Sequence, residues 1–305
     1  MKLIGLMPVR NEDWVLGLSA RAALMWCDQL MLFEHACTDR SAAIVDELQR
    51  EYPDRVAIRH DTGRQWAEMS HRWSLLCAAR LHQATHIALI DADEVLTGNK
   101  FDQVVYIRGI FETLPEGVIL QLPWLALPRT TDRYLTSGTF GRIQRVSVGF
   151  KDDPSMHWAT RNGYDHHHRE PMGAIGGVYT PLKPEDGGLM HLQFLSERRL
   201  RAKQALYQMT ELLRWPAPRI LNGVSCRTQE QLAKRLARMY GTAVYESDPL
   251  AFESSPVPES WWAPYAHLMR YLDIDAEPWQ EREAKRLISE FGAEMFRGLD
   301  LFGVV

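Results

Sequence analysis

The chain has 305 residues, of which 46% are apolar and 24% are charged, a composition that is typical of a globular protein and excludes a disordered one. Its formal net charge of -4 gives no overall basic balance that would point to nucleic acid, although local basic patches remain possible. No apolar run reaches the roughly eighteen residues of a membrane span, and no signal peptide precedes the first expected strand. The four cysteines form no Cys-x-x-Cys pair, which argues against a zinc cluster and fits reduced thiols. We therefore expect a cytoplasmic protein, with peripheral association with a membrane left open.

The first hundred residues alternate between short apolar runs and segments of helical periodicity. The expected strands cover residues 2–9, 30–33, 56–59 and 86–90, and the expected helices cover 14–25, 42–51 and 65–81. An apolar stripe on the last of these helices predicts core positions at Trp66, Met69, Trp73 and Leu76. This alternation predicts an α/β fold with a mostly parallel, doubly wound sheet and flanking helices. The sequence contains neither the Gly-x-Gly-x-x-Gly motif nor the P-loop motif that hold phosphates in other α/β proteins.

The remainder of the chain is irregular at first and then mainly helical. A helix is expected at 101–113 and a strand at 118–127, followed by an irregular stretch at 129–188 that includes an expected hairpin at 139–150. A long irregular stretch inside a globular chain is often the wall or lid of an active site. After a strand at 187–194, helices are expected at 197–214, 228–240, 266–272 and 279–296, with Ser196 and Thr228 as the first two caps. We therefore predict a catalytic domain over 1–195 and a helical C-terminal extension over 196–305.

Three acidic residues, Asp91, Asp93 and Glu94, follow directly on a buried strand. Asp91 and Asp93 are two residues apart, so in a chain that is still extended their carboxylates point the same way. Two converging carboxylates suit a hard divalent cation, Mg²⁺ or Mn²⁺. Open α/β sheets bind their ligands at the edge where such a strand ends. The alternative is that the acidic residues only cap the strand and begin a turn, because a short Asp-x-Asp pattern is common.

Three segments share their order and spacing with a known family: Met7-Pro8-Val9-Arg10-Asn11-Glu12, Glu34-His35-Ala36-Cys37-Thr38-Asp39 and Ile90-Asp91-Ala92-Asp93-Glu94. They resemble the GT-A fold glycosyltransferases of family 2, well over roughly residues 2–100 and more thinly as far as His191. The resemblance implies a GT-A, Rossmann-like fold. It also implies that a sugar is transferred from a nucleotide-sugar, with UDP as the expected nucleotide.

The resemblance also implies roles for individual residues. The nucleotide-sugar would be bound by Pro8, Arg10 and Glu12 in the first loop, Glu34 after the second strand, Arg64 and Arg72 before the Asp-x-Asp strand, and Asp91 and Ala92. The metal that bridges the diphosphate, Mn²⁺ or Mg²⁺, would be bound by Asp91, Asp93 and His191. A histidine ligand favours Mn²⁺. Purely structural alternatives remain: a solvated loop pair for Arg10 and Glu12, a strand end for Glu34, an exposed helix position for Arg72 and a core position for His191.

An acceptor hydroxyl must lose its proton to a general base, which in an inverting enzyme is a carboxylate. The irregular stretch offers Asp165 as the first candidate and Glu170 as the second. The usual base motif of the family is not evident here, so the stereochemistry of the reaction stays open. The adjacent run His166-His167-His168 has no cysteine partner, and we expect it to line a polar cleft or a solvated loop rather than bind zinc.

Two other functions remain compatible with the sequence. A nucleotidyltransferase also combines an α/β sheet with metal-binding carboxylates, but residues 8–13 lack the Gly-rich loop and lysine of that class. The second alternative function is that of a binding protein that has the GT-A fold but no catalytic activity. The acceptor is open: a glycan, a lipid-linked sugar, a protein, a small molecule or modified DNA. A basic cluster consists of Arg198, Arg199, Arg201 and Lys203. It could bind an anionic acceptor, although such runs are usually solvated helix faces.

Overall fold

The computed structural model describes residues 1–63, 66–100, 104–141, 144–159, 169–174, 176–221, 223–248 and 251–305. The chain divides into two compact units. Unit 1 consists of Met1–Leu125, Ile143–Leu192 and Pro256–Ile274, and unit 2 consists of Ala126–Arg142, Gln193–Ser255 and Asp275–Val305. The change of unit after Leu192 lies close to the boundary expected after residue 195. Residues 126–142, expected in the first domain, belong to unit 2, and residues 256–274, expected in the second, belong to unit 1. The two-domain division stays a prediction.

A mixed sheet with the strand order β3-β2-β1-β4-β8-β6-β10-β5 forms the centre of unit 1, and β9 (Val178–Tyr179) pairs with β6. Its first four strands are parallel: β1 (Leu3–Val9), β2 (Gln29–His35), β3 (Val56–Asp61) and β4 (His86–Leu89). β8 (Arg145–Lys151) is antiparallel to β4 and to β6 (Ile119–Ala126), and β10 (Leu189–His191) is antiparallel to β5 (Glu94–Leu96). The α/β fold class is confirmed, with the parallel half of the sheet made by the strands predicted from the first hundred residues.

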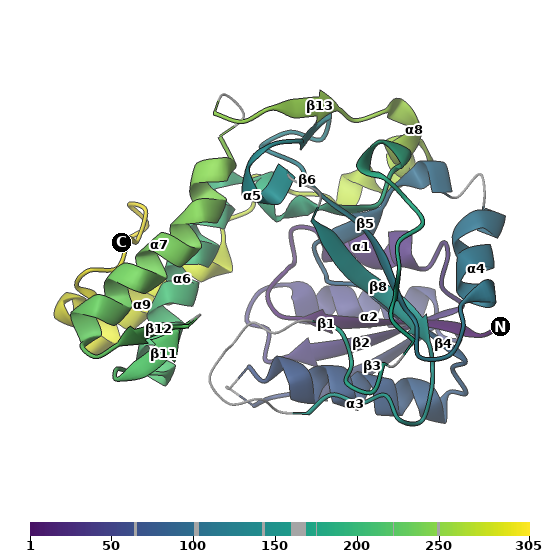
Figure 1. Ribbon diagram of the computed structural model, residues 1–305, viewed down its shortest axis with the longest axis horizontal. Helices are drawn as coiled ribbons and strands as arrows, with labels where there is room; N and C mark the ends of the chain where they lie inside the picture. The colour runs from purple at the N-terminus through teal and green to yellow at the C-terminus, as the bar shows by residue number, and fades with distance from the viewer. Residues whose placement is uncertain are drawn as a thin grey trace. The chain divides into compact units, whose positions relative to one another are not determined.

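Helices cover both faces of the parallel strands. Figure 1 shows α1 (Leu16–Ala23) and α2 (Ser41–Glu51) on one side and α3 (Glu68–Leu81) on the other. Ile4 and Leu6 of β1 pack with Leu75 of α3, because alternate residues of a strand face the same side. The remaining helical segments of unit 1 are α4 (Val104–Thr113), α8 (Glu259–Trp262) and the 3-10 turns Gly98–Lys100, Pro184–Asp186 and Ala263–Tyr271.

The apolar stripe predicted for the third helix is correct at two positions and wrong at Trp73, while the half-buried Trp66 precedes α3, which begins at Glu68. Met69 and Leu76 are buried, but the side chain of Trp73 is 37% exposed. The buried face of α3 instead includes Arg72, which is 2% exposed. A stripe drawn through apolar residues alone missed this position because the charge of Arg72 is balanced inside the protein by carboxylates.

Unit 2 is a small helical assembly. Its helices α6 (Glu197–Arg214), α7 (Gln229–Glu246) and α9 (Trp279–Phe291) pack around an apolar core that includes Leu212 and Leu236 (Figure 1). The smaller elements are α5 (Gly138–Gly141), the strand pairs β11 (Arg219–Leu221) with β12 (Val224–Cys226) and β7 (Arg133–Leu135) with β13 (Ser254–Pro256), and the 3-10 turns Leu192–Phe194 and Ala293–Phe296.

Several expected elements of the second half differ from the structure: the strand expected at 187–194 is limited to β10, and the helix expected at 279–296 ends at Phe291. The segment expected as a hairpin at 139–150 contains the short helix α5 followed by β8, whose partners β4 and β6 are distant in sequence. The helix expected at 266–272 lies in a 3-10 segment that begins earlier, at Ala263. Its Pro264 occupies a first-turn position, where a missing N–H costs little.

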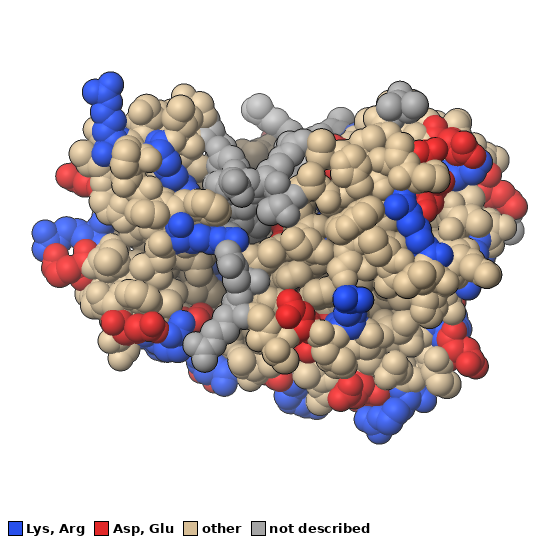
Figure 2. All heavy atoms as spheres, turned by 90° about the horizontal axis from the view of Figure 1, so that it is seen from below, with Lys and Arg blue, Asp and Glu red and all other residues tan. Residues whose placement is uncertain are grey.

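Three further features concern the surface charge, the helices and the cysteines. On the face drawn in Figure 2, the described basic and acidic side chains are interspersed. Within the described residues, no helix combines the length and the apolar character that crossing a membrane requires. The four cysteines, Cys27, Cys37, Cys77 and Cys226, are free thiols.

Candidate functional site

An ionic cluster whose arginines are buried and whose Asp91 side chain is 34% exposed lies just beyond the carboxyl end of β4. One oxygen of Asp91 is 3.0 Å from Arg72 of α3, and the other is 2.9 Å from Arg169. Arg169 also contacts both carboxylate oxygens of Glu94, at 2.9 Å for its Nη1, and donates to the Leu89 carbonyl at 3.3 Å. Arg72 also pairs with Glu68 of its own helix at 2.8 Å, so two guanidinium groups face three carboxylates in a site where Arg72 is 2% and Arg169 8% exposed.

The charge state of this cluster follows from burial and from the arginines. Burial raises the pKa of Asp91, but the neighbouring Arg169 and Arg72 outweigh it and hold that pKa below its ordinary value. Burial also raises the pKa of Glu94, and there the opposing effect of Arg169 is the smaller one. Asp91 is consequently ionised at neutral pH.

The chain from Asp91 to Asp93 is a turn, so the expectation of an extended Asp-x-Asp segment is wrong. β4 ends at Leu89, and residues 92–93 turn the chain into β5. Glu94 fixes this turn because its Oε2 accepts from the Asp91 N–H at 2.9 Å. Asp91 therefore lies against two arginines, whereas Asp93 lies against a histidine.

Asp93 and His191 form a buried pair beside the ionic cluster. Both residues are 5% exposed, and Asp93 Oδ2 lies 3.5 Å from His191 Nε2. The antiparallel pairing of β10 with β5 sets His191 opposite Glu94, and the Leu192 N–H donates to the Asp93 carbonyl at 2.9 Å. The two side chains, 98 residues apart in the sequence, are thus brought together by the sheet.

Trp124 of β6 supports both halves of this arrangement. Its ring stacks on His191 with centroids 4.2 Å apart and an interplanar angle of 16°. Its indole N–H donates to Glu94 Oε1 at 2.8 Å. Trp124 and Arg169 are two site residues that the sequence analysis missed. The local pattern around them gives no signal, because their partners come from distant strands.

The residues present fit a divalent cation at the Asp93–His191 pair. A carboxylate oxygen and an imidazole nitrogen 3.5 Å apart are close enough to bind one ion together, and this donor pair suits Mn²⁺. Asp91 fits this role less directly, because both of its oxygens face guanidinium groups. Asp91, Asp93 and His191 are therefore brought to one place, with only the last two in direct contact.

The loops that follow β1 and β2 are bound to each other next to this site. Asn11 has a left-handed backbone, with φ of 57°, and its side-chain oxygen accepts from the Thr38 N–H at 2.7 Å and the Asp39 N–H at 3.3 Å. The Glu12 N–H donates to the Ser41 hydroxyl at 2.9 Å. Asn11 is a buried residue that the sequence analysis named only as part of the first loop motif, without a role of its own.

Several residues predicted at the nucleotide have structural partners. Pro8 is buried in β1, Arg10 is half-buried, and the Glu12 carboxylate accepts from the indole N–H of Trp14 at 2.6 Å. The Ala92 carbonyl accepts from the Ser19 hydroxyl at 2.5 Å. These contacts fix the loop and the turn, while the binding of a nucleotide by these residues stays a prediction.

Glu34, the residue predicted to meet the base, is the penultimate residue of β2 and is 7% exposed. It accepts from the Cys37 N–H at 2.7 Å and lies 3.1 Å from His60 Nδ1. Burial raises its pKa, but the hydrogen bonds from Cys37 and His60 outweigh burial and lower it. Glu34 is therefore a charged acceptor whose carboxylate is already bound within the loop.

The candidate bases are only partly placed. Asp165, the run His166-His167-His168 and the predicted nucleotide residue Arg64 lie outside the described residues. Glu170 is exposed, and its Oε1 accepts from Gln121 at 2.8 Å and from Ser147 at 2.7 Å.

Two arginines of the basic cluster at the start of α6 pair with carboxylates of unit 2. Arg198 pairs with Glu281 at 2.7 Å, Arg201 pairs with Glu197 at 2.5 Å, and the buried Arg199 donates to the Ala276 carbonyl at 3.0 Å. The side chains of Arg198 and Arg201 remain 57% and 43% exposed, and the binding of an anionic acceptor by this cluster stays a prediction.

Comparisons with known proteins add little to this description. The chain matches no protein-family model, and no curated protein matches it. Among solved structures, S. aureus TarS 1-349 is 9% identical with a TM-score of 0.41, over 97% of this chain and 89% of that one. The same protein in complex with UDP-GlcNAc is 11% identical with a TM-score of 0.39, over 97% and 90%. A 4-diphosphocytidyl-2C-methyl-D-erythritol synthase is 18% identical with a TM-score of 0.31, over 49% and 74%. TM-scores this low carry no argument about the function of this chain.

Proposed function

We propose that this protein is a glycosyltransferase that takes its sugar from a nucleotide-sugar, with UDP as the expected nucleotide. The observation that carries the proposal is the buried Asp93–His191 pair beside Asp91, at the carboxyl edge of the parallel strands. Open α/β sheets bind ligands at that edge. The family-2 resemblance of the three loop motifs supports the same reading.

Asp93 and His191 are the residues that would hold Mn²⁺, or Mg²⁺ in its place. When bound there, the ion would neutralise the negative charge that develops on a departing nucleoside diphosphate. Arg72 and Arg169 keep Asp91 ionised and fixed, so that it can accept hydrogen bonds from the donor's sugar or ribose hydroxyls. The loops that Asn11 joins, the second of which begins next to Glu34, are the proposed nucleotide side of the site.

A carboxylate of the irregular stretch is the proposed general base. Asp165 remains the first candidate from the sequence. Glu170 is the second, and its contacts with Gln121 and Ser147 fix it on the strands β6 and β8. A carboxylate held by two neutral donors and exposed to solvent can accept a proton from an acceptor hydroxyl.

The deciding experiment is calorimetric titration of UDP, GDP, ADP and the corresponding triphosphates, each with Mn²⁺ and with a chelator. We expect one nucleoside diphosphate to bind in a metal-dependent manner. In Asp93→Asn that affinity should fall by more than about tenfold, because a neutral amide is a weaker ligand for a hard cation. A clear preference for a triphosphate would favour a nucleotidyltransferase instead.

Asp46→Asn is the matched control. Asp46 is exposed on α2, so this substitution removes the same charge at a position away from the site. It should leave nucleotide affinity unchanged. His191→Gln should reproduce the loss seen in Asp93→Asn, with the thermal midpoint recorded for every variant. Metal-dependent affinity that is the same in Asp93→Asn as in the parent protein would contradict the assignment.

A further inference from the structure

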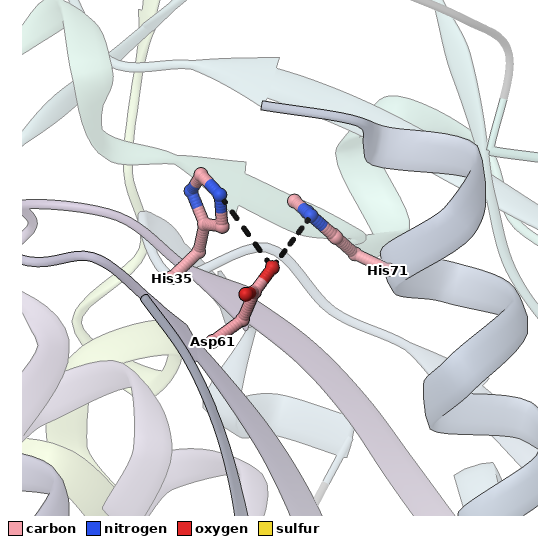
Figure 3. Close-up of side chains that lie close together, drawn as sticks. All are labelled: His35, Asp61 and His71. Carbon is pink, nitrogen blue, oxygen red and sulfur yellow. Dashed lines mark ion pairs between the residues drawn. The ribbon is translucent and has the colours of Figure 1, made fainter. Parts of the chain in front are cut away.

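Three metal-ligating side chains from three elements meet at the edge of the parallel sheet, as Figure 3 shows: His35, Asp61 and His71. His35 ends β2, Asp61 ends β3, and His71 lies near the start of α3. One ligand atom from each residue lies within 4.8 Å of the other two. From this geometry we propose a second metal site, for Zn²⁺ or a similar divalent transition-metal ion, made by these three residues.

The fold itself fixes two of the three ligands. β2 and β3 are parallel, and their register sets His35 directly beside Asp61. The Ala36 N–H donates to the Asp61 carbonyl at 2.7 Å, which holds the two strand ends together. α3 then brings His71 over the same point, so the cluster does not depend on a long loop.

The distances suit a small ion. Asp61 Oδ2 lies 3.8 Å from His35 Nε2 and 3.8 Å from His71 Nε2. Ligand atoms about 2.0–2.2 Å from a tetrahedral Zn²⁺ are roughly 3.3–3.5 Å apart. Each of these pairs would therefore have to close by only about 0.5 Å.

Asp61 is oriented towards the imidazoles and remains open to solvent. Its Oδ1 accepts from the Gly63 N–H at 2.9 Å, which leaves Oδ2 on the side of the two rings. The side chain of Asp61 is 41% exposed, whereas those of His35 and His71 are 0% and 4% exposed. An ion can thus reach two buried nitrogens past one exposed carboxylate.

Aromatic side chains surround the two imidazoles. Phe33 stacks on His71 with centroids 4.5 Å apart, and Trp66 meets both histidine rings edge-on, at 5.4 Å for His35 and 4.8 Å for His71. Burial, followed by the effect of His35, lowers the pKa of His71 to about 4. The aromatic contacts therefore fix the orientation of both imidazoles at this point.

The donor set selects the class of ion. Two imidazoles and one carboxylate suit Zn²⁺ and its neighbours, whereas Mg²⁺ and Ca²⁺ prefer oxygen ligands throughout. Three protein ligands leave a fourth position for water or another ligand. Such an ion would clamp the ends of β2 and β3 to α3, and this role does not depend on the glycosyl-transfer proposal.

The test is titration of the metal-free full-length protein with Co²⁺ and with Zn²⁺, followed by visible absorption for Co²⁺ and calorimetry for Zn²⁺. The parent protein should bind Zn²⁺ at a site that Asp61→Asn weakens by more than about tenfold, since the amide removes the charged ligand at nearly constant volume. The Co²⁺ spectrum of a site with nitrogen ligands should be lost in the same variant. Zn²⁺ should raise the melting temperature of the parent protein but not that of Asp61→Asn.

Two controls separate this site from others. His86→Gln removes a different buried histidine, 6% exposed, and should leave Zn²⁺ binding intact. Asp93→Asn removes the other candidate metal ligand and should also leave it intact. The proposal is overturned if the parent protein binds no Zn²⁺ tightly, if Asp61→Asn binds it as the parent does, or if only Asp93→Asn loses it.

Discussion

At the scale of single residues, Arg169 has the most consequential set of contacts in the candidate site. One guanidinium group contacts Asp91 and Glu94 and donates to the carbonyl of Leu89, where β4 ends. Asp91 lies 78 residues earlier in the chain. Because the guanidinium group is almost fully buried, removing it would leave Glu94 in the interior without its main counter-charge.

We predict that Arg169→Met lowers the free energy of unfolding by about 3–5 kcal/mol, the usual cost of breaking a buried ion pair from one side. Urea denaturation followed by circular dichroism measures this change. The matched control is Lys151→Met, because Lys151 is 36% exposed and its partner Glu116, 2.9 Å away, is 63% exposed. That change should cost no more than about 1 kcal/mol. Equal effects of the two substitutions would show that Arg169 is not a structural ion-pair partner.

At the scale of elements, the helices of unit 2 begin where their cap sequences predict. The Ser196 hydroxyl accepts from the Arg199 N–H at 3.3 Å at the start of α6. At the start of α7 the Thr228 hydroxyl accepts from the Gln231 N–H at 3.2 Å, and the Gln231 side chain accepts from the Thr228 N–H at 3.4 Å. Each bond satisfies a first-turn N–H that has no partner inside the helix.

We predict that Thr228→Ala destabilises the protein by about 1 kcal/mol, because it removes the hydroxyl acceptor of this capping box. Thr242→Ala removes the same hydroxyl from within α7, where alanine has the higher helix propensity, and should be neutral or slightly stabilising. The comparison needs only the urea midpoints of the two variants. A Thr228→Ala midpoint as high as that of Thr242→Ala would argue that the capping box contributes nothing to stability.

At the scale of the whole molecule, acid stability should depend in part on Glu281, which links α9 to α6. Its oxygens lie 2.7 Å from Arg198 and 2.7 Å from Lys285. The hydrogen bond from Arg198, and then that from Lys285, lower the pKa of Glu281 to about 2. A folded-state pKa below the unfolded value gives stability that is complete above about pH 4.5 and is lost as the pH falls towards 2.

We therefore predict that Glu281→Gln lowers stability at pH 6 and that the difference from the parent protein shrinks as the pH falls from about 4.5 to 2. Arg198 and Lys285 are each 57% exposed, so solvent screening limits the effect to about 1 kcal/mol. Denaturation curves across this pH range measure it. Glu230→Gln, whose carboxylate is 72% exposed, should show a smaller difference. A difference between Glu281→Gln and the parent that does not vary with pH would refute the linkage.

The sequence by itself determined the α/β class, the parallel strands of the first hundred residues and the helical caps of unit 2. These features depend on neighbouring residues, because the periodicity of a strand or helix and the hydroxyl of a cap act within a few positions. It also indicated Asp91 and Asp93 as candidates, since a strand that ends in carboxylates is visible in the order of residues, whereas His191 was a candidate only through the family resemblance. Whether these residues bind a metal and a nucleotide-sugar stays a proposal.

Only the tertiary structure decided which distant side chains meet. Arg169 and Trp124 join the site through Glu94, and His35 meets Asp61 and His71 through the register of β2 with β3 and the docking of α3. The physical reason is that a buried charge is stabilised by whichever partner the packed strands bring within hydrogen-bond distance. That partner can be far away in the sequence, so no local pattern encodes it.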